Sequence, residues 1–142
     1  MTEDELEPIT ALLLKRGRRL TALDIMEAES AFMKAAIAMA QFQLRYDVIL
    51  SPTLGLPAVS LGAASLSQPV DDYVRLVKGY NPFTAIYNVT GQPAMSIPFG
   101  MSGEGTPLGI QFAARLGQEE TLLSLAGQIE RAKPWFSARP PI

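Results

Sequence analysis

The sequence contains no cysteine and no histidine. Without cysteine the chain has no disulfide scaffold and no thiol nucleophile, and without either residue it has no Cys/His zinc site. The missing imidazole also excludes a catalytic triad in which histidine is the base. We therefore expect neither a metal nor another cofactor.

Charge is also scarce. Charged residues make up 18% of the chain, and the formal net charge is −2. No overall basic field is present to attract nucleic acid or anionic lipid. Residues 15–19 form a basic cluster, but no aromatic platform accompanies it, and a solvated helix end explains it better than a nucleic-acid patch. We expect no nucleic-acid partner.

The sequence shows neither a secretory leader nor an uninterrupted membrane span. Its first residues are acidic, where a leader would carry basic residues and then an apolar run. Two uncharged stretches, residues 48–70 and 79–103, have the length of a span, but each holds three prolines that would break an exposed helix. We expect a cytoplasmic protein with no membrane partner.

What the chain does have is a high apolar content, 48% of 142 residues, which is enough for one core. We therefore expect a single domain, or a fragment of one, over residues 1–142. A capping pattern at Thr2 predicts a first helix that ends at Gly17. Thr21 and Asp24 predict a capped second helix running to about Arg45, whose apolar residues extend far enough around it to need cover on more than one side.

Two further helices are predicted in the second half. Asn81 and the proline after it fit the N-cap and first position of a short helix that Gly91 ends. The last helix opens at Glu119 and is closed by Pro134, with basic residues near its negative end. A long loop is expected over residues 54–68, which are rich in Gly, Ala, Ser and Pro.

Runs of branched and apolar residues at 48–50, 94–97 and 108–113 predict three strands buried on both faces. The order of the elements predicts an α/β fold, with helices packed on a mixed β-sheet. Three strands would leave sheet edges that a complete protein pairs or covers, so the chain resembles a piece of a larger sheet.

Two motifs in this region have ordinary explanations. The glycine-rich segment 103–109 lacks the third glycine of a dinucleotide loop and leads into a strand, so it predicts a turn. Gln111 places an amide in an apolar strand, where we expect it to have a structural hydrogen-bonding role.

Five blocks resemble the C-terminal part of amidase-signature-family hydrolases, in the family's order and over essentially the whole chain. Within this family, the chain resembles bacterial amidases of the 6-aminohexanoate-cyclic-dimer hydrolase kind. The blocks are DVILSPT at 47–53, FTAIYNVTGQPAMSIP at 83–98, TPLGIQF at 106–112, ETLL at 120–123, and ERAKPW at 130–135 followed by Arg139-Pro140.

The resemblance implies hydrolysis of carboxamides by a Ser-cis-Ser-Lys triad. In the family this triad lies in a Gly/Ser-rich signature upstream of the part matched here. The chain contains neither a Gly-Gly nor a Ser-Ser dipeptide, so the signature is absent from it. The resemblance thus implies no catalytic residue in this chain, which we expect to be inactive alone.

The resemblance also implies that residues 80–88 lie near the substrate pocket, with Tyr80, Asn81, Phe83 and Thr84 as candidate pocket residues. Glutamine-acting relatives carry an acidic residue near the position of Asn81. The neutral side chain here argues against recognition of a substrate α-amino group and leaves the amide substrate open.

An alternative from another class is a non-catalytic interaction module that binds a partner chain through its sheet edge and apolar faces. Under either reading we expect self-association, because surface that normally faces the missing part would be uncovered.

Overall fold

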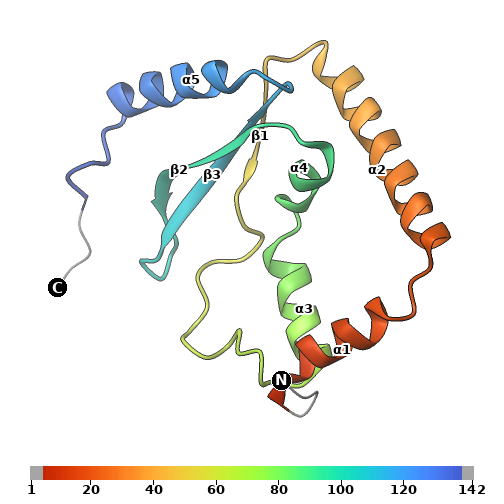
Figure 1. The fold of residues 1–142 in the computed structure, drawn as a ribbon. Coiled ribbons are helices and arrows are strands. Elements are labelled where there is room, and N and C mark those ends of the chain that lie inside the picture. Colours follow the sequence, from red (N-terminus) through yellow and green to blue (C-terminus); the bar gives the residue numbers. More distant parts are fainter. Residues whose placement is uncertain (1–4, 139–142) are drawn as a thin grey trace.

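A computed structural model of the chain describes residues 5–138 (Figure 1). These residues combine helices with one sheet, which confirms the predicted α/β class. In chain order the elements are α1 Pro8–Gly17, α2 Ala22–Gln43, β1 Val48–Pro52, α3 Val70–Tyr80, α4 Ala85–Thr90, β2 Ala94–Met101, β3 Pro107–Ala114 and α5 Glu119–Ala132.

The sheet has the strand order β1-β3-β2, and both of its pairings are antiparallel. We expected a mixed sheet, but the described strands have no parallel pair, since β2 and β3 are joined by a short turn that reverses the chain. In this turn Gly105 has a φ of 79°, and the Ser102 N–H donates to the Thr106 carbonyl at 2.8 Å. The predicted turn is therefore confirmed.

The two faces of the sheet differ in polarity, because successive side chains of a strand point to opposite faces. Ser51, Gln111 and Ser96 lie opposite one another on the three strands and make one face polar. Figure 1 shows α5 on one side of the sheet and α3 and α4 on the other. The prediction that both faces are buried is wrong for this chain, since Leu50 on the apolar face remains 58% exposed.

The first helix begins later than its capping pattern suggested. Thr2 lies outside the described residues, and α1 starts at Pro8 with Glu7 as N-cap. A proline is tolerated in the first turn of a helix, where its missing N–H is no loss, but not farther inside. Pro8 therefore marks the start more reliably than the capping pattern before it.

The second helix matches its prediction closely. The Thr21 and Asp24 side chains form a capping box, and α2 ends at Gln43, close to the predicted end. The Asp24 carboxylate accepts hydrogen bonds from the Thr21 hydroxyl and backbone N–H at 2.6 and 2.7 Å. These bonds favour the charged form and lower the pKa of Asp24 below its ordinary value of 3.8.

Helix α3 was not predicted, and it changes the role of Asn81. Asn81 is the C-cap of α3, and its N–H donates to the Val77 carbonyl at 2.9 Å. The N-cap of α4 is Thr84, so the prediction that Asn81 is an N-cap is wrong. The predicted end of this short helix is confirmed, because Gly91 is its C-cap with a φ of 74°.

The buried apolar core of the described residues is small. It consists of Ile9, Tyr87, Ile97, Ala113, Ala114 and Leu122. Many large apolar side chains remain exposed, most of all on α2. None of the helices in residues 5–138 combines the length and apolar character that crossing a membrane requires.

Candidate functional site

The four predicted pocket residues lie together, where α3 ends and α4 begins. Tyr80 is the last residue of α3 and is half-buried, and its carbonyl accepts from the Gly55 N–H at 3.0 Å. Asn81 is exposed, whereas Phe83 and Thr84 are half-buried. The structure therefore holds this segment as one tight connection between two helices.

Gln111 connects the segment to the sheet. It is 5% exposed, and its Nε2 donates to the Phe83 carbonyl at 3.3 Å and to the Ser51 hydroxyl at 3.2 Å. A buried amide needs such partners, because leaving it without them costs free energy. The predicted structural role of Gln111 is therefore confirmed, and the polar face of the sheet is the one that faces the Phe83 carbonyl.

A pair of hydroxyls extends this polar face. The side-chain oxygens of Thr53 and Ser96 are 2.6 Å apart, although the residues are on different segments. They meet over Gly109, where an added Cβ would lie 2.8 Å from the Ser96 oxygen and 2.9 Å from the Thr53 oxygen. Only glycine fits at this position without displacing the pair, a role that sequence reasoning missed.

The polar face and the Tyr80–Thr84 segment together form the candidate site. Its polar groups are the Thr53 and Ser96 hydroxyls on the sheet face, and its apolar group is the half-buried side chain of Phe83, whose carbonyl is bonded to Gln111. Nearby in α4, burial raises the pKa of the Tyr87 phenol above its ordinary value of 10.0, so this side chain is neutral at physiological pH. The arrangement can bind a polar group beside an apolar one, but it presents no ionised group for catalysis.

The described serines and lysines do not form a nucleophile and base pair. Lys133 Nζ donates to the Phe99 carbonyl at 2.6 Å and lies 4.7 Å from the centre of the Phe99 ring. Within residues 5–138, no lysine Nζ is hydrogen-bonded to a serine hydroxyl. Across the same residues, acidic side chains do not gather in a group that could hold a metal ion.

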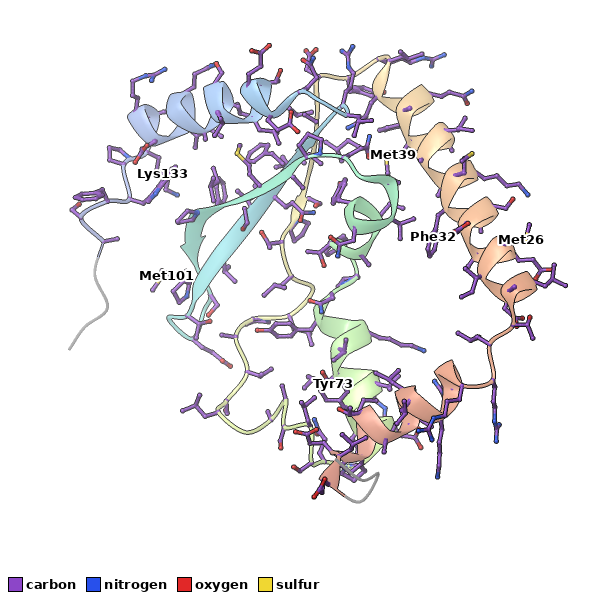
Figure 2. The ribbon with its side chains drawn as sticks, viewed as in Figure 1. Met26, Phe32, Met39, Tyr73, Met101 and Lys133 are labelled. Carbon is purple, nitrogen blue, oxygen red and sulfur yellow. The ribbon has the colours of Figure 1, made fainter. Side chains whose placement is uncertain are left out.

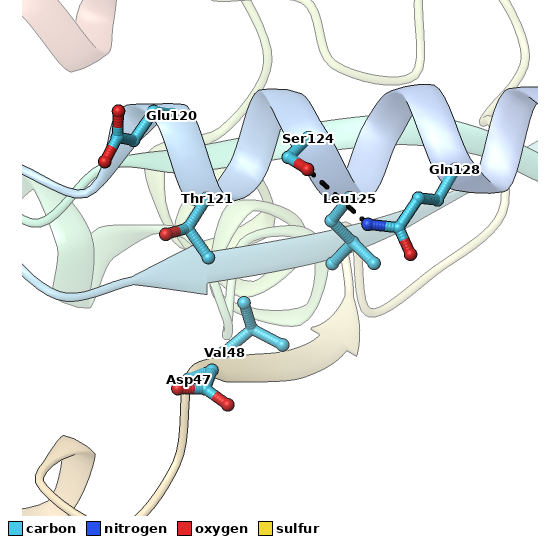
Figure 3. Close-up of a pocket in the computed structure, with 7 residues that line it drawn as sticks. All are labelled: Asp47, Val48, Glu120, Thr121, Ser124, Leu125 and Gln128. Carbon is cyan, nitrogen blue, oxygen red and sulfur yellow. Dashed lines mark hydrogen bonds between the residues drawn. The ribbon is translucent and has the colours of Figure 1, made fainter.

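Two cavities lie elsewhere. One, of about 550 Å³, is an open space between α5 and the start of β1 (Figure 3). The close-up shows Thr121 and Leu125 of α5 facing Val48 across it, while Ser124 is hydrogen-bonded to Gln128. The other, of about 390 Å³, runs along α2. Neither is lined by Tyr80, Asn81, Phe83 or Thr84, so the pocket role of these four residues stays a prediction.

The sequence of this chain is similar to those of known amidases. The family model described as Amidase matches residues 4–123. A 6-aminohexanoate-cyclic-dimer hydrolase from Pseudomonas sp. strain NK87 is 31% identical over 149 aligned positions, which cover 100% of this chain and 30% of that protein. An amidase from Pseudomonas putida is 33% identical over 92% of this chain and 28% of its own length.

The fold is similar to that of a solved relative over nearly the whole chain. The structure of a 6-aminohexanoate cyclic dimer hydrolase superposes on 99% of this chain with a TM-score of 0.85 and 28% identity. The match covers 30% of that structure, and it corresponds to the C-terminal portion of the relatives. This chain therefore spans about 30% of the length of the curated relatives named above.

Proposed function

Because this chain belongs to the amidase family, we propose that it forms the C-terminal scaffold of an enzyme that hydrolyses carboxamide C–N bonds. The observation that carries the proposal is the agreement of fold over 99% of the chain with a cyclic amide hydrolase. The relatives' names suggest cyclic and linear amides as the substrate class.

In this proposal the bond is broken by a Ser-cis-Ser-Lys triad that lies outside the chain. A serine hydroxyl needs an adjacent base to act as a nucleophile at neutral pH. The lysine that contacts the sheet, Lys133, is instead bonded to a backbone carbonyl. The chain by itself is then inactive, and its contribution is to shape and support the pocket.

The candidate site supplies one wall of that pocket. Phe83 would contact the apolar part of the substrate, and Thr84, Tyr80 and Asn81 would border it. The Thr53 and Ser96 hydroxyls lie on the sheet face to which Gln111 fixes this segment, and they could hydrogen-bond to a polar group of the substrate.

The test is a chimera in which this chain replaces the matched portion of the Pseudomonas sp. strain NK87 hydrolase. We expect the chimera to hydrolyse the cyclic dimer of 6-aminohexanoate or a linear amide, and the isolated chain to hydrolyse neither. A folded chimera that cleaves no amide would contradict the proposal. So would turnover by the isolated chain that is lost when one of its own serines is replaced.

Phe83→Ala in the active chimera tests the pocket wall. Removing the ring should lower kcat/KM for bulky amides about tenfold more than for small ones, because an apolar contact of this size is worth one to a few kcal/mol. Phe99→Ala, at a 51% exposed position on β2 whose ring contacts Lys133, is the control. An equal change in kcat/KM for bulky and small amides would show that Phe83 does not line the pocket.

The alternative, an interaction module without catalysis, is favoured by the exposed apolar side chains of α2. It predicts that the chain binds a partner while the chimera remains inactive. A monodisperse monomer that binds no hydrophobic dye would count against this alternative and against the scaffold proposal alike.

A further inference from the structure

One side of α2 carries an apolar stripe that no described element covers. Met26, Met33, Ile37 and Leu44 recur at helical spacing and are 65%, 67%, 53% and 73% exposed. Another side of the helix packs toward α4. Figure 2 shows Met26 and Phe32 on different sides of α2. Apolar surface thus extends around the helix beyond what this chain can bury.

A groove of about 390 Å³ runs beside this stripe. Its lining from the α2 side includes Met33, Ile37 and Leu44. The opposite wall comes from the end of α4 and the residues that flank the sheet: Thr90, Gln92, Arg115 and Leu116. The groove therefore has one apolar wall and one mixed wall, as a surface that receives polypeptide commonly does.

The groove also contains an amide donor without an acceptor. Gln43 is 0% exposed and lines the groove, and its Oε1 accepts from Gln92 Nε2. Its own Nε2 has no hydrogen-bond partner among the described residues. Two buried amide side chains, those of Gln43 and Gln92, therefore line the groove.

The total surface shows how much cover is missing. The accessible area is 10547 Å², whereas size scaling gives about 7,200 Å² for a compact monomer of this mass. The excess is roughly 3,000 Å², several times the area of about 800 Å² that one partner buries in a standard interface. Such an excess is typical of a part separated from a larger folded unit.

We propose that the α2 stripe and its groove are the docking surface for the portion of the amidase fold that this chain does not match. This inference rests on the proposed function. The occupant is that portion because the chain accounts for 30% of the related structure and superposes on it over 99% of its own length. The rest of that fold is large enough to cover the excess area, whereas a second copy in a standard interface is not.

The absence of cysteine allows a direct test by thiol labelling. Met33→Cys places a thiol on the stripe, and Lys34→Cys places one on the polar side of the same helix, where the native residue is exposed. Each full-length variant is mixed with the unmatched N-terminal portion of the Pseudomonas sp. strain NK87 hydrolase, produced as a separate chain. Mass spectrometry then follows maleimide addition to the variant, and light scattering follows complex formation.

We expect a one-to-one complex in which labelling at position 33 slows about tenfold or more, while labelling at position 34 changes little. Met33→Lys should weaken the complex by about tenfold or more, because it places a charge in an apolar interface, and Lys34→Met should not weaken it. Circular dichroism of each free variant separates lost folding from lost docking.

Three results would overturn the inference: no complex, a complex in which position 33 stays reactive, or protection that appears with rising concentration of the chain alone. The last would assign the stripe to a second copy. The labelling and light-scattering measurements do not depend on amide hydrolysis. The docking surface and the proposed function can therefore be contradicted separately. A complex in which position 33 is protected from labelling but which hydrolyses no amide would contradict the proposed function. A complex that hydrolyses amides while position 33 stays reactive would contradict only the proposed docking surface.

Discussion

Gln111 links the sheet to the segment that carries the candidate pocket residues. Its amide is shared between the Phe83 carbonyl and the Ser51 hydroxyl. The position of Phe83 therefore depends on a side chain that approaches from the sheet, far away in sequence. Such a contact fixes geometry more firmly than apolar packing does, because each hydrogen bond has a preferred direction.

Gln111→Leu keeps the volume of this side chain but removes both donated hydrogen bonds. The Phe83 carbonyl and the Ser51 hydroxyl then lose their partner, so we expect the free energy of unfolding to fall by about 1–3 kcal/mol. Urea unfolding of the isolated chain measures this change. Gln128→Leu, which removes an exposed 3.5 Å bond on α5, should have a much smaller effect. Equal stabilities of the two variants would contradict the role of Gln111.

Tyr87 makes the stability depend on alkaline pH. Burial raises the pKa of its phenol above 10.0 in the folded state. The folded chain thus holds its proton where the unfolded chain releases it, and stability is retained below pH 10 but falls as pH rises above it. Urea unfolding of the chain and of Tyr87→Phe at pH 8 and above pH 10 should show a smaller loss for the variant. Tyr46→Phe, at a 51% exposed position, should behave like the original chain.

Single residues also show what the sequence could and could not predict at the site. The structural role of Gln111 followed from an amide in an apolar strand. The Thr53 and Ser96 pair over Gly109 did not follow, because alternation assigns a residue to a face only once strand pairing and register are known. The signal was present as small polar residues at every second position, but only the order β1-β3-β2 brings them together.

Among the elements, helix ends were predictable where one local feature dominated. The Thr21 and Asp24 capping box and the left-handed Gly91 act within a few residues, so both were found. Helix α3 was missed, although Val70, Tyr73, Val74 and Val77 have helical spacing. Asn81 was misassigned because the residue before a proline disfavours helical angles and suits the end of one helix as well as the start of another.

Two glycines at helix ends give opposite predictions for the same substitution. Gly91→Ala forces a φ of 74° on a residue with a side chain and should cost about 1 kcal/mol. Gly17→Ala, in the last turn of α1 with open space around it, should raise stability by about 0.5–1 kcal/mol. Thermal unfolding of both variants measures the difference. Shifts of the same sign would show that backbone strain does not govern these positions.

At the scale of the whole molecule, the sequence predicted that three strands and an all-round apolar helix need more cover than one small chain provides. The structure shows where that cover is missing, along α2 and at the sheet edges. The sequence could not show which faces would be covered, since this depends on how β1 and β2 flank β3 and on which side α5 packs. Those arrangements are fixed by contacts between distant segments.

The shortage of buried surface should be measurable in the unfolding of the isolated chain. Size scaling gives about 22,000 Å² for the unfolded chain and about 15,000 Å² buried in a compact monomer of this mass. With 10547 Å² still accessible in the folded state, the buried area is about a fifth smaller. The urea m-value is proportional to the area exposed on unfolding, so we expect it to be roughly a fifth below that of compact proteins of equal length. In the complex with the unmatched amidase portion, hydrogen exchange along α2 should slow as the stripe is covered. An m-value equal to that of compact proteins of the same length would mean that the isolated chain buries its own apolar surface. This result would contradict an exposed stripe on α2.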